Sequence, residues 1–480
     1  MIQFKKFTET ELLKMSIYLL RAIGREIGVK APASKKKEEL VRDILLIQQG
    51  KLKPVPKTKK GAPPKMDKEL LKPYIIETEN TVQDYSVIED VDRKLVLNDK
   101  ETNDEFVSEG VLALHQSGFG FLRANNYENS RENDIYVSMQ NIRKYNLRVG
   151  DKVKAKAKIT RDGDSAALQE VISINDLSPE LFPNRKKFEE LIPYYPTDRI
   201  RLETNDDNDY SMRFIDLFAP LGMGQRGLIV APPKTGKTTL LKKIARSIET
   251  NHKDVKLIVL LIDERPEEVT DIQRSVNGEV VFSTFDESPE HHIKVAELVI
   301  NRAKRLVEVG QNVVILMDSI TRLSRAYNNV IESSGRTLSG GLDPVALNGP
   351  KRFFGSARNI ENGGSLTILS TALIETGSRM DDVIFEEFKG TGNMEIHLSK
   401  ELSEKRIFPS IDLKKSGTRK EELLLSKNEL DCAYKIRKFL SARNDATDTL
   451  IEMLKKSKNN EELSSKIDVW LKLYQNRNEI

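Results

Sequence analysis

A phosphate-binding loop at residues 231–239 constrains this chain more than any other feature of its sequence. The segment reads Ala-Pro-Pro-Lys-Thr-Gly-Lys-Thr-Thr, and it follows an apolar run and precedes a stretch with helical spacing of apolar residues. A buried strand, a tight loop and a helix in this order direct backbone N–H groups and the positive helix end at phosphate oxygens. Ala231 replaces the first consensus glycine. A chance Gly-Lys-Thr in a surface turn would lack this context, so we expect a nucleotide-hydrolysing protein.

Each polar position of the loop has an expected role. Gly236 leaves room for phosphate, Lys237 can neutralise charge on the β and γ groups, and the Thr238 hydroxyl can coordinate the accompanying metal ion. We therefore expect ATP and Mg²⁺ as cofactors. The residues predicted to contact them in this loop are Pro233, Lys234, Thr235, Gly236, Lys237, Thr238 and Thr239.

Length and composition narrow the protein class. A chain of 480 residues is too long for one hydrophobic core and should form several domains. Its 31% charged residues, its mean hydropathy of −0.46 and the lack of a membrane-length apolar run predict no membrane association. The first residues do not resemble a signal peptide, so we expect a cytoplasmic location. Cys432 is the only cysteine, which excludes an intrachain disulfide and a cysteine-based metal site.

The first hundred residues differ from the rest in their charge distribution and in their apolar patterns. Residues 1–50 carry two helical patterns and predict a small helical module. Residues 51–105 begin with a Pro- and Lys-rich linker and continue into an acidic connector. The excess of basic residues at the N-terminus is consistent with a nearby polyanion. The lysines of the linker could equally serve solubility.

Short alternating strands dominate residues 106–177 and predict an OB/cold-shock-like β-barrel. In the run Gly-Phe-Gly-Phe, Phe119 and Phe121 are two residues apart and share one face of a strand. Together with Tyr136 they predict a stacking platform for unpaired bases, with Arg123 on the same face available for a phosphate or base edge. The alternative is that both phenylalanines belong to the barrel core.

After a proline-punctuated connector at 178–200, apolar runs alternate with helical stretches, as in a mostly parallel sheet with helices on both faces. Two of the runs end in acids, at Asp263-Glu264-Arg265 and at Asp318-Ser319. Because ligands bind beyond the carboxyl ends of parallel strands, Asp318 is predicted to help hold Mg²⁺ and Glu264 to activate the attacking water. Either acid could instead be an ordinary helix N-cap.

Five motifs together resemble the family of the bacterial transcription termination factor Rho. The resemblance covers the chain from about residue 106 onward and is carried by residues 227–238, 260–269, 318–327, 386–394 and 416–423. It implies a homohexameric, ATP-driven RNA translocase with a RecA-like motor at 201–416 and a C-terminal helical part at 417–480. It also implies that nascent single-stranded RNA and transcribing RNA polymerase are partners and that the activity ends transcription.

The resemblance assigns roles to further residues. Arg419 matches an arginine finger supplied across the subunit interface, Arg406 a second interface arginine that senses the γ-phosphate, and Phe408 the ring stacked on adenine. By its local sequence alone, Arg419 would be an ordinary surface arginine. The predicted catalytic set is Glu264, Lys237, Arg419, Arg406 and Arg265.

Two glycine-rich loops, at 335–341 and 376–381, resemble the family's RNA-gripping channel loops, with Arg336 and Arg379 placed to contact the strand. Arginine stands there where the family often has lysine, which changes the donor geometry. Flexible connectors are the alternative for both loops. The stretch 164–168 lacks the aromatic residue that the family's barrel carries there, so a preference for cytidine-rich RNA does not follow.

Two other functions fit parts of the pattern. Rotary or export-type ATPase subunits also have acid-ended strands beside a phosphate loop, and they have no use for a base-stacking barrel. A non-translocating RNA-binding protein with a regulatory nucleotide site is the second alternative. The joint presence of Lys237, Thr238, Glu264, Asp318 and Arg419 argues against an inactive site.

Overall fold

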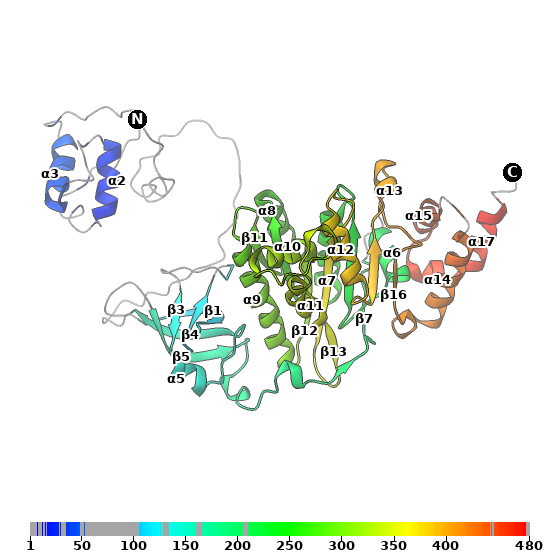
Figure 1. The fold of residues 1–480 in the computed structure, drawn as a ribbon, viewed down its shortest axis with the longest axis horizontal. Helices are drawn as coiled ribbons and strands as arrows, with labels where there is room; N and C mark the ends of the chain where they lie inside the picture. Colours follow the sequence, from blue (N-terminus) through cyan, green and yellow to red (C-terminus); the bar gives the residue numbers. More distant parts are fainter. Residues whose placement is uncertain are drawn as a thin grey trace. The chain divides into compact units, whose positions relative to one another are not determined.

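The computed structural model contains two compact units, Met1–Val96 and Leu97–Ile480, which are described separately (Figure 1). It describes residues 7, 12, 15, 17–27, 29, 35–48, 52, 105–124, 126–127, 134–159, 166–204, 210–441, 443 and 446–476. Nearly all of the predicted linker and acidic connector lies outside these residues. So do Asp164 and Ser165 of the stretch without the family's aromatic residue.

The first unit contains the predicted helical module. Its described helices are α2 (Ile17–Ile27) and α3 (Lys37–Gln48). Leu20 and Ile23 on α2 and Leu40 and Ile44 on α3 are fully buried in one cluster. The spacing of three or four residues within each pair places both side chains on one helix face, which explains why the two helices pack.

A closed barrel forms the start of the second unit and confirms the predicted OB-like fold. Its strand order is β1-β2-β3-β5-β4, and a short helix, α5 (Met139–Lys144), follows β3. The strands are β1 (Glu105–Leu114), β2 (Gly120–Arg123), β3 (Ile135–Val137), β4 (Lys152–Ile159) and β5 (Ala166–Ile174).

Strand β5 does not show the strict alternation of buried residues that is expected of a half-buried strand. Its buried residues, Leu168, Val171 and Ile174, recur every third position and not every second one. The register between β4 and β5 shifts at two points, and each shift resets which side chain faces inward. An alternation rule therefore misses this strand.

The described part of the motor is built on a nine-stranded sheet with the order β11-β10-β12-β14-β9-β15-β16, while β13 pairs with β14 and β6 pairs with β13. The pairs from β11 to β15 along this order are parallel, and β16 is antiparallel to β15. The strands are β6 (Pro193–Tyr194), β9 (Arg226–Ala231), β10 (Lys256–Glu264), β11 (Glu279–Thr284), β12 (Asn312–Asp318), β13 (Arg358–Ile360), β14 (Ser365–Leu373), β15 (Met394–His397) and β16 (Gly417–Thr418). A separate small sheet pairs β7 (Arg199–Ile200) with β8 (Leu221–Gly222).

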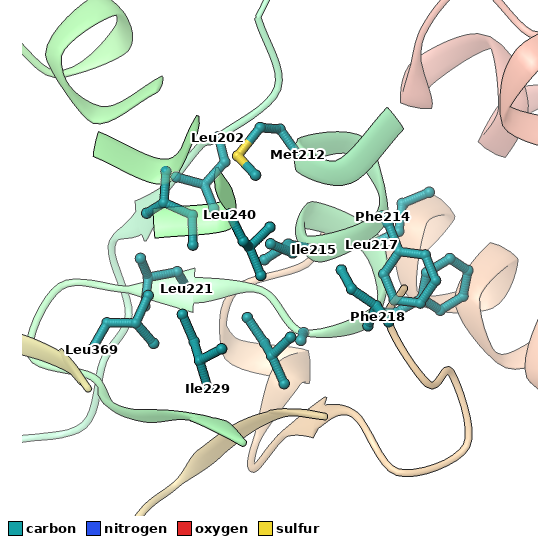
Figure 2. Close-up of a cluster of buried hydrophobic side chains, with 14 of the residues drawn as sticks. Leu202, Met212, Phe214, Ile215, Leu217, Phe218, Leu221, Ile229, Leu240 and Leu369 are labelled. Atoms are coloured by element: carbon teal, nitrogen blue, oxygen red, sulfur yellow. The ribbon is translucent and has the colours of Figure 1, made fainter. Parts of the chain in front are cut away.

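Helices cover both faces of the motor sheet. The helices are α6 (Tyr210–Phe218), α7 (Lys237–Asn251), α8 (Pro266–Ser275), α9 (Pro289–Glu308), α10 (Ile320–Val330), α11 (Asn348–Gly355), α12 (Arg379–Lys389) and α13 (Lys400–Glu404). Side chains of β10 alternate between two cores: Val259 packs with α6, α7 and α8, whereas Leu260 packs with α9 to α12. Figure 2 shows the first core, in which Ile215 and Phe218 of α6 lie over Ile229 of β9. The nearly continuous apolar strands follow from this burial on two faces.

The C-terminal segment adds four described helices, α14 (Lys427–Leu440), α15 (Ala446–Lys456), α16 (Asn460–Ser465) and α17 (Ile467–Asn476). Their apolar residues join the core that contains α6. Arg213 of α6 donates hydrogen bonds to the carbonyl oxygens of Leu454 (2.7 Å) and Ser457 (2.8 Å), which fixes α15 to the motor. None of the helices in the described ranges is long and apolar enough to cross a membrane.

Candidate nucleotide site and nucleic-acid interface

The phosphate loop has the geometry that its sequence predicts. Strand β9 ends at the buried Ala231, and α7 begins at Lys237, one residue after Gly236, whose φ of 84° suits glycine. The segment around α13 holds the loop from outside: Ser410 Oγ donates to the Thr235 carbonyl (2.7 Å), and Ser403 Oγ donates to the Lys234 carbonyl (3.0 Å). These bonds leave the N-terminal N–H groups of α7 available for an anion.

Asp318 and Lys237 meet at the carboxyl edge of the sheet, where Asp318 ends β12 and Lys237 follows β9. Asp318 Oδ1 lies 2.7 Å from Lys237 Nζ and accepts a hydrogen bond from Thr371 Oγ1 of β14 at 2.8 Å. The parallel order β12-β14-β9 brings these residues together from distant parts of the sequence. The structure therefore places Asp318 beside the phosphate loop, as predicted.

Glu264 is the second acid at this edge of the sheet, and only 2% of its surface is exposed. Its Oε2 lies 3.3 Å from Arg322 Nη1 and 3.7 Å from Lys237 Nζ. Burial, followed by the nearby Asp318 charge, raises the pKa of the Glu264 carboxyl above its ordinary value. A carboxylate with a raised pKa at this position is suited to accept a proton from water.

The residues at the loop fit a bound Mg²⁺. Asp318 Oδ2 is buried and has no hydrogen-bond partner among the described residues, so one carboxylate oxygen remains available as a ligand. The Thr238 hydroxyl lies at the start of α7 and donates to Glu268 Oε2 at 3.2 Å. Mg²⁺ prefers one or two protein oxygens together with water and phosphate oxygens, which this pair can provide.

A pocket of about 290 Å³ adjoins the loop on the side of Phe408. Thr235, Gly236 and Thr239 line it together with Phe408, whose side chain is half exposed. A Cβ built on Gly236 would lie 3.8 Å from the Phe408 ring, so the ring lies beside the entrance to the loop. This arrangement is consistent with the predicted stacking of Phe408 on a base. Pro233 and Lys234 of the loop are exposed.

The structure separates Arg419 from the phosphate loop of its own chain. Arg419 follows β16, and its N–H donates to the carbonyl of Asn393, which directly precedes β15. Met394 of β15 pairs with Gly227 at the start of β9, whereas the loop follows the end of β9. At a rise of about 3.3 Å per residue, the six residues of β9 separate the two places by about 20 Å. Arg419 is exposed there, so any role in catalysis requires a second subunit.

The other two predicted catalytic arginines lie on the loop's side of the sheet. Arg406 is exposed and follows α13 with a φ of 60°, two residues before Phe408. Arg265 is exposed at the start of α8, directly after Glu264. Their contacts with nucleotide stay predictions.

The two glycine-rich loops lie against each other. A Cβ on Gly340 would lie 2.6 Å from the backbone nitrogen of Met380, so no side chain fits between them. Arg336 and Arg379 are both exposed on these loops, and Arg379 opens α12. Asp381 in the first turn of α12 is buried and accepts hydrogen bonds from Arg325 and Thr376. The loops are thus held to the motor while their arginines remain accessible.

Aromatic rings gather on one face of the barrel. The Phe119 ring centroid lies 5.7 Å from that of Phe121, 5.6 Å from that of Tyr136 and 4.5 Å from that of His115. Phe119 and Phe121 are partly buried, and Tyr136 is 37% exposed, so the rings form a surface cluster outside the barrel core. We call Phe119, Phe121 and Tyr136 the ring platform.

Arg123 lies beneath the ring platform. Its guanidinium carbon is 5.0 Å from the Phe121 centroid, and the side chain forms a buried ion pair with Asp134. Only 9% of the residue is exposed. This placement supports the Phe121 ring, and the predicted direct contact of Arg123 with RNA stays a prediction.

Sequence reasoning assigned no role to several residues that contact this machinery. Arg322 pairs with Glu264, Thr371 holds Asp318, and His115 stacks on Phe119. Arg322 falls four residues after Asp318, so its position at the start of a helix was a usable signal. Thr371 can bond Asp318 only because β14 lies next to β12, and the sequence does not reveal that strand order.

Comparisons with known proteins decide the family. The model of the Rho termination factor RNA-binding domain matches residues 108–180, and that of the ATP synthase alpha/beta family nucleotide-binding domain matches residues 211–418. Transcription termination factor Rho of Bacillus subtilis (strain 168) is 59% identical over 364 residues, which make up 75% of this chain and 85% of that protein. The chain belongs to the Rho termination factor family. The Aquifex aeolicus (strain VF5) Rho is 47% identical over 469 residues, or 96% of this chain and 95% of that protein.

Membership in the Rho family confirms the resemblance carried by the five motifs and the predicted order of barrel and P-loop motor. Among solved structures, an ATPase from the type III secretion system of pathogenic bacteria matches at 22% identity with a TM-score of 0.49. That match covers 63% of this chain and 95% of the other chain. A similarity at this level carries no argument for the export-type alternative.

Proposed function

We propose that this protein is an ATP-dependent RNA translocase that binds nascent single-stranded RNA and terminates transcription. The observation that carries the proposal is the presence, in one compact unit, of the ring platform on the barrel and the Lys237, Glu264 and Asp318 cluster at the phosphate loop. A rotary or export-type subunit has no need of a surface cluster of rings. An RNA-binding protein with only a regulatory nucleotide site has no need of a buried carboxylate of raised pKa.

The chain's own residues account for the hydrolytic step. Lys237 and the N–H groups of the loop bind the phosphates, while Asp318 and Thr238 would hold Mg²⁺, which neutralises phosphate charge when bound. Glu264 orients a water molecule and accepts its proton, and Arg322 holds the Glu264 carboxylate in place. Burial of both acids excludes bulk water and strengthens their interactions with the reacting groups.

The location of Arg419 supports a ring of identical subunits. An exposed arginine about 20 Å from its own phosphate loop can stabilise the transferring phosphoryl group only in a neighbouring subunit. We therefore propose a homohexamer in which each ATP site is completed by Arg419 and sensed by Arg406. RNA then passes the channel loops, where Arg336 and Arg379 contact its backbone, and the complex acts on transcribing RNA polymerase in the cytoplasm.

RNA-stimulated ATPase activity tests this proposal. Turnover is measured in Mg²⁺ without RNA and with each of four homopolymer RNAs at matched nucleotide concentration. We expect low turnover without RNA and a clear rise with at least one single-stranded homopolymer, and the ranking of the four gives the base preference. Equal turnover with and without every RNA would overturn the translocase function and favour one of the two alternatives.

A further inference from the structure

Asn126 and Tyr127, which follow barrel strand β2, bind the strand at the edge of the motor sheet. Asn126 and Tyr127 both have left-handed backbones, with φ of 47° and 57°, and their side chains reach strand β11. In the sheet order β11 is a terminal strand, with β10 on its inner side. An edge strand presents backbone N–H and C=O groups that need partners.

The Asn126 carboxamide pairs with both backbone groups of Phe282 in β11. Nδ2 donates to the Phe282 carbonyl at 2.9 Å, and Oδ1 accepts from the Phe282 N–H at 2.8 Å. One side chain thereby takes the place that a residue of a further strand would occupy. The donor and acceptor of the amide match the acceptor and donor of the peptide, so a carboxylate of the same shape would not fit.

Tyr127 adds a second contact with the same strand. It is 6% exposed and packs within the core that contains α9 to α12, and its hydroxyl binds the Glu279 carboxylate at the start of β11. Glu279 also lies 3.9 Å from Arg302, whose Nη1 donates to Asn175 Oδ1 at 2.5 Å, and Asn175 follows β5 of the barrel. Barrel residues from two places therefore reach the first residue of β11, Tyr127 directly and Asn175 through Arg302.

Strand β11 is the strand that flanks Glu264. Thr284 pairs with Glu264 in the β10–β11 register, and Phe285 N–H donates to the Glu264 carbonyl at 3.2 Å. Phe282 precedes Thr284 by two residues. On the barrel side, Asn126 follows β2, which carries Phe121 and the Arg123 guanidinium beneath that ring. The clamped strand therefore lies between the ring platform and the catalytic carboxylate.

We propose that Asn126 is a positioning residue that couples RNA bound at the ring platform to turnover at Glu264 through strand β11. The proposal rests on the proposed RNA-stimulated ATPase. Stacking of bases on Phe119, Phe121 and Tyr136 displaces β2, and the amide pair transmits that displacement to β11. Without the pair, RNA still binds the barrel, but β11 no longer follows it.

Asn126→Asp is the sharpest variant, because it keeps the shape and places a second acceptor opposite the Phe282 carbonyl. Asn141→Asp is its matched control: Asn141 Nδ2 donates to the Leu168 carbonyl at 3.1 Å within the barrel. For both variants of the full-length protein, RNA affinity, basal ATPase, the ATP KM and RNA-stimulated kcat are measured with the homopolymer that stimulates the wild type best. Because coupling between sites typically amounts to about 5- to 150-fold, we expect Asn126→Asp to lower stimulated kcat at least about fivefold. RNA affinity, basal turnover and the ATP KM should stay within about twofold of wild type, and Asn141→Asp should match the wild type.

Hydrogen exchange provides a readout that loss of packing alone would not change. We expect RNA to alter exchange of the β10 and β11 amides near Glu264 in the wild type and in Asn141→Asp, and to leave it unaltered in Asn126→Asp. If Asn126→Asp does not fold, Asn126→Gly replaces it, since glycine accepts the left-handed backbone at this position and the change removes the amide pair without adding a carboxylate. Stimulation of Asn126→Asp, or of its replacement, equal to that of Asn141→Asp would overturn the coupling role. A wild type that RNA does not stimulate would instead overturn the proposed function.

Discussion

Arg325 and Asp381 form a two-point ion pair that joins helix α10 to the second glycine-rich loop. Arg325 Nε lies 2.7 Å from Asp381 Oδ1, and Nη2 lies 2.7 Å from Oδ2. Helix α10 begins two residues after Asp318 and also carries Arg322, which pairs with Glu264. Asn328 near its end donates to the Gly341 carbonyl of the first glycine-rich loop at 3.3 Å. One helix therefore contacts Glu264 and both loops.

Asp381→Asn should uncouple the channel loops from the ATP site. The buried Asp381 would lose the charge that Arg325 recognises, and removing one partner of such a bond costs about 1–3 kcal/mol of unfolding free energy. We expect RNA-stimulated turnover to fall while basal turnover is retained, as measured by ATPase rates across an RNA titration.

Glu387→Gln is the matched control on the same helix. Glu387 pairs with Lys351 at 2.7 Å, but both side chains are more than a third exposed, so the change should cost about 0–1 kcal/mol. A normal response to RNA in Asp381→Asn, with its stability lowered, would show that the pair only holds α12 in place.

Glu264 should give the enzyme an acidic limb in its pH profile. Burial and the Asp318 charge raise the pKa of Glu264, and only the ionised carboxylate can accept a proton. As the pH falls through this raised pKa, kcat/KM should decline, and above it kcat/KM should be flat. Arg322 lowers this pKa by its positive charge, so Arg322→Gln should move the limb to higher pH.

A variant of a distant charge separates this effect from general electrostatics. Arg274→Gln removes an exposed positive charge from the last turn of α8 and should leave the limb where it is. The assignment of Glu264 as the base fails if Arg322→Gln keeps the wild-type limb, or if Glu264→Ala retains turnover. Glu264→Ala should still bind ATP, because Lys237 and the loop are intact.

The sequence revealed those parts of the sites that lie within single motifs. Strand, loop and helix are contiguous at 226–251, so the phosphate loop and the role of Lys237 could be predicted from local pattern. The placement of Asp318 at the same edge of the sheet as Lys237 followed from the rule for parallel strands. These two steps required no knowledge of strand order.

Contacts that depend on strand order or on loop conformation could not be predicted. Thr371 reaches Asp318 only because β14 lies next to β12, and Asn126 reaches Phe282 only because β11 is at the sheet's edge. The buried pairing of Arg123 with Asp134 likewise depends on where β3 lies in the barrel. Alternation in β2 showed that Arg123 shares a face with Phe121, but it did not show that Asp134 pairs with Arg123.

The ring platform should contribute most of the barrel's affinity for RNA. Phe119→Ala and Phe121→Ala should each weaken binding by about 1–3 kcal/mol, since each removes one stacking surface, without changing ATP affinity. Fluorescence anisotropy with labelled single-stranded RNA measures the effect. Tyr434→Ala, on α14, removes a ring that is 51% exposed and lies outside the ring platform, and it should leave binding unchanged. Unchanged RNA affinity in both phenylalanine variants would show that these rings serve the barrel fold.

Mixed subunits test whether Arg419 acts in the neighbouring ATP site. Arg419→Ala leaves its own phosphate loop intact, and Lys237→Ala disables the loop but keeps Arg419, so each variant alone should have little RNA-stimulated activity. Co-assembled rings contain interfaces at which an intact loop faces an intact Arg419, because the two residues lie at opposite ends of the same strands. Activity should therefore reappear on mixing and depend on the ratio of the two variants. Mixtures of Lys237→Ala with Glu264→Ala are the control, since both lesions lie in the same loop site and no interface is complete. If Arg419→Ala and Lys237→Ala fail to complement in rings shown to be mixed, Arg419 does not act across the interface.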